Sequence, residues 1–253
     1  MESGQLILSG QNGELKMKKI RMKIATKDNI HSLVRRNKIG SIEALLNQNP
    51  GLVTATDHKG RTPLMCTTNY EVLALLVQRG ADVNAEDEFG RSALHHAAEE
   101  DKTVYAKNLI RLGANVDIAD KCGWTPIFIS VGNRNMEMTD LLIREGANLD
   151  VQGAKSATPL LMAFMYGNLE IVFTLLNNGA NINAATDSGN TLLHYAALWY
   201  TAEALDVFRN YGGDMTAKNK KGLNPAEICQ VMRMYRSIND PDSEDYMDLQ
   251  LVV

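Results

Sequence analysis

Histidine and cysteine are the residues with the most versatile chemistry in this chain of 253 residues. Two adjacent histidines, His95 and His96, have side chains of a type that binds metal ions, and Cys122, close to Trp124, carries a thiol that a nearby base could activate as a nucleophile. The sequence has no phosphate-binding glycine loop, no H-E-x-x-H, no G-x-S-x-G and no C-x-x-C. We therefore expect no catalytic residues, no metal and no cofactor, and a protein that is not an enzyme.

Glycines recur every 33 residues, and each ends an apolar segment. The series is Gly80, Gly113, Gly146, Gly179 and Gly212. A second series of dipeptides follows the same spacing after a first step of 30 residues: Thr62-Pro63, Ser92-Ala93, Thr125-Pro126, Thr158-Pro159, Thr191-Leu192 and Asn224-Pro225. Two independent markers with one period indicate a repeated structural unit.

Each unit is predicted to hold two helices. Threonine at the N-cap and proline at the first helical position start the first helix, as in Thr125-Pro126. Glycine ends the second helix because it adopts the left-handed conformation without a Cβ penalty. Apolar pairs such as Leu141-Leu142 form a stripe that faces the neighbouring unit. The bends of the intervening hairpins carry Gly60, Gly90, Gly123, Gly189 or Gly222.

A 33-residue unit of this kind resembles the ankyrin repeat, whose signature contains T-P-L-H-x-A. The clearest copies lie at residues 60–64, 92–98 and 191–197. The resemblance implies an all-α fold, an ankyrin-repeat solenoid of stacked helix-turn-helix units with β-hairpin fingers. It also implies that His95 and His194 are structural, each bonded to backbone in the neighbouring loop.

Units are expected to start near residues 27, 57, 87, 120, 153, 186 and 219, giving about five full repeats between two degenerate caps in an ankyrin-repeat domain of residues 27–238. Leu64 to Gly80 is three residues shorter than Leu94 to Gly113, which predicts a first helix about one turn shorter in that repeat. Ser156 stands where the pattern has glycine, so the shape of the fourth hairpin is uncertain.

The two ends of the chain differ from the repeats. Residues 1–26 form a basic leader, interpreted as a solvated segment, with a short strand, an amphipathic arm or a nuclear-import patch as alternatives. Residues 239–253 form an acidic tail that is poor in core residues and is expected to be disordered. The segment around Tyr246 and the chain end at Val253 are weak candidate ligand motifs within that tail.

Composition limits the partners and the location. The net charge of −4 gives no reason to expect nucleic acid, and we find no signal peptide and no uninterrupted apolar span of membrane length. Three cysteines in separate repeats favour reduced thiols. We expect a monomer that does not bind membranes and that lies in the cytoplasm, with the nucleus as the alternative.

The resemblance implies that partners bind the concave face, at hairpin residues beside the turn glycine and at the exposed end of the first helix. Transfer by register yields these candidates: Arg61, Phe89, Arg91, Lys121, Trp124, Asn133, Tyr166, Asn190 and Trp199. The four aromatic residues would form a stripe over successive repeats, and aromatic and arginine side chains dominate binding hot spots. The alternative is that Trp124 and Trp199 fill space between repeats.

The sequence thus predicts a module that binds a protein partner as an adaptor, scaffold or inhibitor. Two inhibitor alternatives stay open, one like ankyrin-type inhibitors of cyclin-dependent kinases, because of the shortened helix, and one like the IκB inhibitors of transcription factors, because of the repeat number and acidic tail. The third alternative is a microbial effector or regulatory subunit with a concealed activity at Cys122 or at His95 and His96.

Overall fold

The computed structural model describes residues 29–199 and 202–238. The predicted leader and the predicted acidic tail, with its two candidate motifs, lie outside the described residues. The chain divides between Glu88 and Phe89 into two compact units. Both units contain paired helices, which confirms the all-α repeat fold, whereas a single repeat domain over residues 27–238 stays a prediction.

The first unit contains two helix pairs, of which the second is shortened. Its elements are α2 (Ile30–Arg35), α3 (Ile39–Gln48), the 3₁₀ turn η1 (Pro50–Thr54), the 3₁₀ turn η2 (Leu64–Cys66) and α4 (Tyr70–Gln78). The turn η2 occupies the place of a first helix, and its three residues replace the seven of α5 in the next repeat. The predicted shortening is therefore confirmed. Val34, Ile42 and Leu73 are buried completely in this unit.

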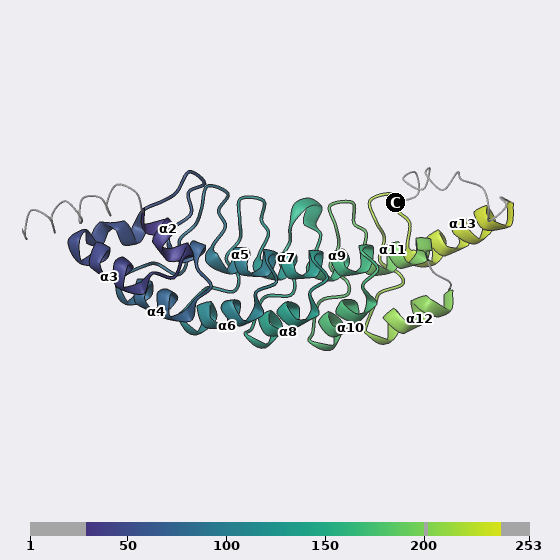
Figure 1. Ribbon diagram of the computed structural model, residues 1–253. Helices are drawn as coiled ribbons and strands as arrows, with labels where there is room; N and C mark the ends of the chain where they lie inside the picture. The colour runs from purple at the N-terminus through teal and green to yellow at the C-terminus, as the bar shows by residue number, and fades with distance from the viewer. Residues whose placement is uncertain (1–28, 200–201, 239–253) are drawn as a thin grey trace, which may run out of the picture. The chain divides into compact units, whose positions relative to one another are not determined.

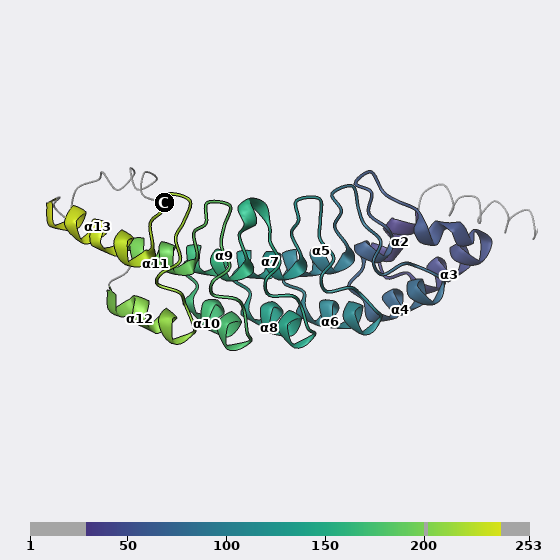
Figure 2. The same ribbon diagram turned by 180° about the vertical axis from the view of Figure 1, so that it is seen from behind.

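The second unit contains four helix pairs and a final helix. Its helices are α5 (Ala93–Glu99), α6 (Thr103–Arg111), α7 (Pro126–Gly132), α8 (Met136–Arg144), α9 (Pro159–Met165), α10 (Leu169–Asn177), α11 (Leu192–Trp199), α12 (Ala202–Asn210) and α13 (Pro225–Ile238). Within this unit α5, α7, α9 and α11 form a row beside the hairpins, here termed the inner row, and α6, α8, α10 and α12 form the outer row (Figures 1 and 2). Helix α13 packs on α11.

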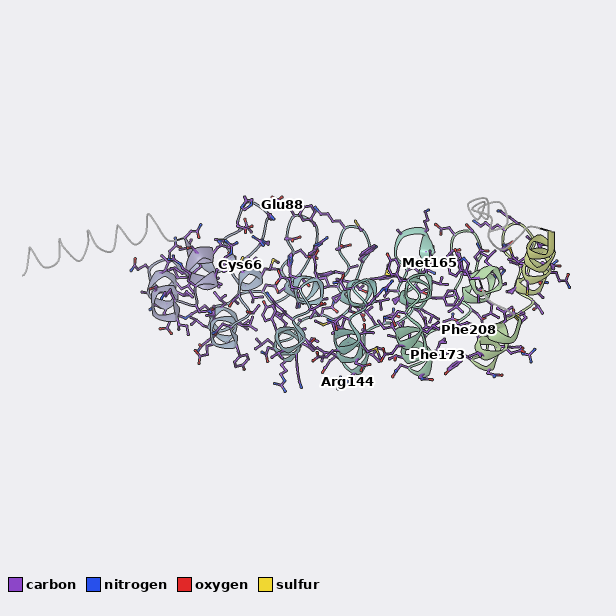
Figure 3. All side chains as sticks on the ribbon, turned by 45° about the vertical axis from the view of Figure 1, so that its right-hand side comes forward. Cys66, Glu88, Arg144, Met165, Phe173 and Phe208 are labelled. Carbon is purple, nitrogen blue, oxygen red and sulfur yellow. The ribbon has the colours of Figure 1, made fainter. Side chains whose placement is uncertain are left out.

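Apolar side chains hold the two rows together. Phe128 and Phe164 of the inner row are almost fully buried, as is Leu142 of the outer row. The rings of Phe173 and Phe208 stack at 6.2 Å between α10 and α12, and Figure 3 shows both residues on that side of the unit. Burial of each such side chain contributes about 1.5–3 kcal/mol, so the rows are stabilised mainly by this packing.

Helix ends follow the predicted glycines closely. Gly113 has a φ of 94°, and the next amide, that of Ala114, donates to the carbonyl of Leu109 at 3.0 Å to close α6. Helix starts are less uniform. The Thr158 hydroxyl accepts a bond from the Leu161 amide, but the Thr125 hydroxyl is buried without a partner among the described residues. The N-cap bond predicted for Thr125 is therefore wrong, and Pro126 starts α7 through its fixed φ.

The hairpins, here termed fingers, are hydrogen-bonded turns, and no residue in the described ranges belongs to a β-strand. The Asp120 amide donates to the Trp124 carbonyl at 2.8 Å and so closes one finger. Adjacent fingers are also joined, since the amides of Lys121, Asp187 and Lys220 donate to carbonyls of the preceding fingers. These bonds give the fingers of the second unit a fixed spacing.

The fourth finger has a different shape. Its 3₁₀ turn η3 (Ala154–Ser156) places two successive residues, Lys155 and Ser156, in the left-handed region at φ 57° and 55°. Other fingers place a single glycine there, such as Gly189 at 78°. The Ser156 hydroxyl donates to the Asp187 carboxylate at 2.5 Å, which ties the turn to the next finger. The replacement of glycine by Ser156 therefore changes the turn, as its position in the sequence indicates.

Candidate protein-binding surface

The histidines of the repeat motif are structural. His95 accepts a bond at Nδ1 from the Ser92 amide at 3.0 Å, and its Nε2 lies 3.0 Å from the Trp124 carbonyl. His194 repeats this arrangement with Thr191 and the Leu223 carbonyl. Burial lowers the pKa of both imidazoles, although their bonds to carbonyls act in the opposite direction. Each neutral histidine thus links its helix to the following finger, as predicted.

The thiols and acidic groups form no cluster that could hold a metal ion within the described residues. Cys66 is half-buried, Cys122 is exposed and Cys229 is buried, and all three are free thiols. No group of three or more His, Cys, Asp or Glu side chains that could hold a metal ion occurs in residues 29–199 and 202–238.

Arg61 belongs to the first unit and forms an internal ion pair. Two nitrogens of its guanidinium, Nε and Nη2, donate to the same oxygen of the Asp57 carboxylate, at 3.1 and 2.8 Å. Burial raises the pKa of the Asp57 carboxyl, but hydrogen bonds from Arg61 and from the Lys59 and Arg61 amides outweigh it and hold the pKa well below its usual range. This bonding makes Arg61 a structural element of its own finger.

Phe89, Arg91 and Lys121 lie together at the start of the second unit. The Phe89 ring is 58% exposed, and the Arg91 guanidinium lies 5.9 Å from its centroid. Arg91 also donates to Glu99 at 2.9 Å. The Lys121 amide donates to the Phe89 carbonyl at 3.0 Å. These contacts place an exposed aromatic ring and cations on two neighbouring fingers, and their part in binding stays a prediction.

Trp124 packs within its own repeat, and Asn133 bonds the preceding repeat. The Trp124 ring is half-buried and stacks on Phe128 at 6.3 Å. The Asn133 amide donates to the carbonyls of Ala98 and Glu99 at the end of α5. The stack holds the Trp124 ring against its own first helix, and the Asn133 bonds brace two neighbouring repeats.

Asn190 requires a correction. We expected it on the binding surface, but its side chain is buried, with only 1% of the residue exposed. The Asn219 amide group donates to the Asn190 side-chain oxygen at 2.9 Å, which joins two fingers from within. Asn190 therefore makes an internal contact, because its side chain at the end of the finger points inward.

Tyr166 and Trp199 are both 46% exposed and lie on the same part of the inner row. Trp199, at the end of α11, stacks on Phe164 at 5.6 Å and contacts Tyr195 at 6.2 Å. Met165, next to Tyr166, is 52% exposed, and Figure 3 shows it on the finger side of the unit, opposite Arg144. Large apolar side chains are usually scattered when exposed, so this cluster is a candidate surface for binding.

A pocket of about 270 Å³ opens within this cluster, between the fourth and fifth fingers. Its apolar wall consists of Ala157, Met162, Met165, Tyr166 and Tyr195, and its finger side of Ala154, Lys155, Thr186, Asp187 and Ser188. We define these residues together with Trp199 as the pocket surface. Sequence reasoning missed the pocket, although the register contained a signal, since Ala157 stands at the position of Arg61, Arg91 and Trp124.

No helix within the described ranges is both long and apolar enough to cross a membrane.

Paired helices that stack side by side, with a bonded finger before each pair, define a helical repeat protein. The family model for ankyrin repeats matches this chain in three copies, at residues 30–120, 102–186 and 139–219. The chain therefore belongs to the ankyrin-repeat family. The structure is also similar to the crystal structure of the ankyrin repeat domain of Bcl-3, a protein described as a unique member of the IkappaB family. The TM-score is 0.71 at 25% identity, and the match covers 82% of this chain and 98% of that chain.

Proposed function

We propose that this protein is a non-enzymatic interaction module that binds a protein partner through the pocket surface of its second unit. The observation that supports the proposal most strongly is the cluster of Met165, Tyr166 and Trp199, each about half exposed, around a pocket open to solvent. Ankyrin repeats are a general protein-binding fold, and fold alone does not name the partner.

The structure of the cluster fits a binding hot spot. Trp199 rests on the buried Phe164 ring, so its exposed face is held in place before binding. A fixed aromatic side chain loses little conformational freedom in a complex, which lowers the cost of association. Tyrosine and tryptophan at such positions often contribute about 2 kcal/mol or more each.

A second candidate function is regulation of a transcription factor in the manner of the IκB family. The similarity over 98% of the Bcl-3 ankyrin domain favours this candidate over the kinase-inhibitor alternative. At 25% identity the similarity does not extend to individual contact residues.

The test is affinity capture from lysate of the source cells, with the wild type beside a Tyr166→Ala/Trp199→Ala variant. Loss of two hot-spot side chains should weaken the partner's binding by at least about 30-fold, which corresponds to about 2 kcal/mol. The captured partner should be present with the wild type and absent with the variant, and isothermal titration with the purified partner should reproduce the difference.

The control variant is Val104→Ala/Leu169→Ala, which removes exposed apolar side chains from the outer row of the same unit. It should retain the partner. If both double variants bind as the wild type does, while melting at similar temperatures, the pocket surface is not the binding site and the proposal fails.

A further inference from the structure

The pocket exists because one small residue interrupts a series of large ones. The last residue of successive fingers is Arg61, Arg91 and Trp124, and then Ala157. The Trp124 ring packs on Phe128 in its own repeat, whereas Ala157 lines an open pocket. A volume of about 270 Å³ lies just below the range of about 300–1,000 Å³ typical for sites of small molecules. The pocket is large enough for one large side chain of a partner protein.

Two lysines and one aspartate lie on the fingers at the pocket, and of these Lys155 and Asp187 line it. Lys155 lines the pocket, is exposed and forms no ion pair with any described residue. Lys220 lies two fingers further along the chain than Lys155. Its side chain is exposed and likewise forms no ion pair in the described part of the chain. The acidic group between them, Asp187, accepts a hydrogen bond from Ser156.

Backbone bonds fix how far apart the two lysines lie. The Asp187 amide donates to the Lys155 carbonyl at 3.1 Å, and the Lys220 amide donates to the Ser188 carbonyl at 2.9 Å. Each bond joins neighbouring fingers, so a single finger separates Lys155 from Lys220. The finger between them contributes Asp187 and Ser188 to the pocket wall.

We propose that the pocket surface binds an acidic segment of a partner protein in extended form, with one large aromatic or aliphatic side chain in the pocket and a carboxylate on each side of it. In an extended chain, residues i, i+2 and i+4 share one face and i to i+4 spans about 13 Å. An anchor at i+2 then enters the pocket while acidic residues at i and i+4 meet Lys155 and Lys220. The inference rests on the proposed function and names the chemistry of the partner.

The test uses fluorescence anisotropy with the full chain and a fluorescein-labelled peptide, Gly-Ser-Glu-Ser-Trp-Ser-Glu-Ser-Gly, with blocked ends. Binding should weaken at least about tenfold when the peptide's tryptophan becomes alanine and at least about tenfold when both glutamates become lysines. It should also weaken as salt rises, because exposed charges are screened.

Two protein variants probe the two parts of the surface. Ala157→Trp should fill the pocket from within, and Lys155→Glu/Lys220→Glu should repel the acidic peptide. Each should weaken binding at least about tenfold. The matched control is Lys107→Glu, on the exposed side of α6, which should change binding less than about twofold. The lysine reversals change exposed side chains only, so they remain informative if Ala157→Trp does not fold.

The inference is overturned if acidic and basic peptides bind equally, if the lysine reversals leave affinity unchanged, or if no binding occurs at millimolar peptide. Such a failure is distinguishable from failure of the proposed function. A partner captured by the wild type and lost with Tyr166→Ala/Trp199→Ala would still support the pocket surface as a protein-binding site, with a partner of different chemistry.

Discussion

At the scale of single residues, the buried histidines should make stability depend on pH. Burial lowers the pKa of His95 and His194 in the folded protein, whereas both imidazoles have a pKa of about 6.5 when unfolded. Below pH 6.5 the unfolded chain therefore takes up protons first, and stability falls as pH decreases toward the folded pKa. Well above pH 6.5 both states are neutral at these positions. The midpoint of urea unfolding should thus be constant from pH 8 to 7 and fall from pH 6.5 to 5.

The substitution His95→Gln/His194→Gln should make that pH dependence smaller. It should also lower stability at pH 7 by about 1–3 kcal/mol for each histidine, because buried partners such as the Trp124 carbonyl lose their donor. The control is His58→Gln, at an exposed position of the first finger, which should lower stability at pH 7 far less because its side chain is not buried. If the urea midpoint of the double variant falls with pH as steeply as that of the wild type, the acid sensitivity comes from carboxylates and not from these histidines.

The sequence predicts residue roles well where a role lies within one motif. His95 and His194 could be assigned because the motif fixes both their helix position and the carbonyl they reach. Asn133 and Asn190 could not, since they belong to no motif that names the group each bonds in the neighbouring repeat. The pocket depends on the absence of a large side chain at Ala157, and a single small residue is not part of a recognisable sequence motif.

At the scale of elements, the glycines of the fingers and those of the helix ends should differ in their tolerance of alanine. Gly90 has a φ of 77°, and a Cβ there would lie 2.9 Å from the Lys121 amide nitrogen. Gly113 has a φ of 94°, but a Cβ would meet nothing within 4 Å. Both substitutions incur the left-handed penalty of about 1–2 kcal/mol. Gly90→Ala should cost more than Gly113→Ala, because it also forces two fingers apart.

Urea unfolding of both alanine variants measures this difference, and the loss of the bond between Lys121 and Phe89 should appear as faster hydrogen exchange at the Lys121 amide. Equal losses of stability would mean that the fingers separate without cost and that their bonds contribute nothing to the packing of neighbouring repeats.

Helix boundaries were predictable from sequence because glycine and proline act through backbone geometry alone. The short η2 followed from a count of residues between Leu64 and Gly80. Side-chain caps were less predictable, since the Thr125 hydroxyl is buried without a partner while the Ser92 hydroxyl reaches His95. The fourth finger was recognisable as different at Ser156, but its two left-handed residues and its bond to Asp187 depend on the next repeat.

At the scale of the whole molecule, the 33-residue period predicts identical neighbours and so gives no reason for a division. The structure nevertheless separates into two compact units between Glu88 and Phe89. The first unit contains the three-residue turn η2 in place of a first helix, so this repeat has a shorter element for packing than the seven-residue α5 of the next repeat. A repeat protein is stabilised by contacts between neighbouring units, and a weak unit limits cooperativity along the chain.

The two units should therefore respond separately to equivalent core mutations. Leu73 in the first unit and Leu142 in the second are both completely buried, and each change to alanine should cost about 2–5 kcal/mol locally. Both tryptophans of the chain, Trp124 and Trp199, lie in the second unit, so their fluorescence reports its unfolding. Leu142→Ala should shift the fluorescence midpoint in urea strongly, whereas Leu73→Ala should shift it little and instead speed hydrogen exchange in α2, α3 and α4. Equal shifts from the two variants would show that the units unfold as one, in which case the coupling between repeats exceeds the loss of packing at η2.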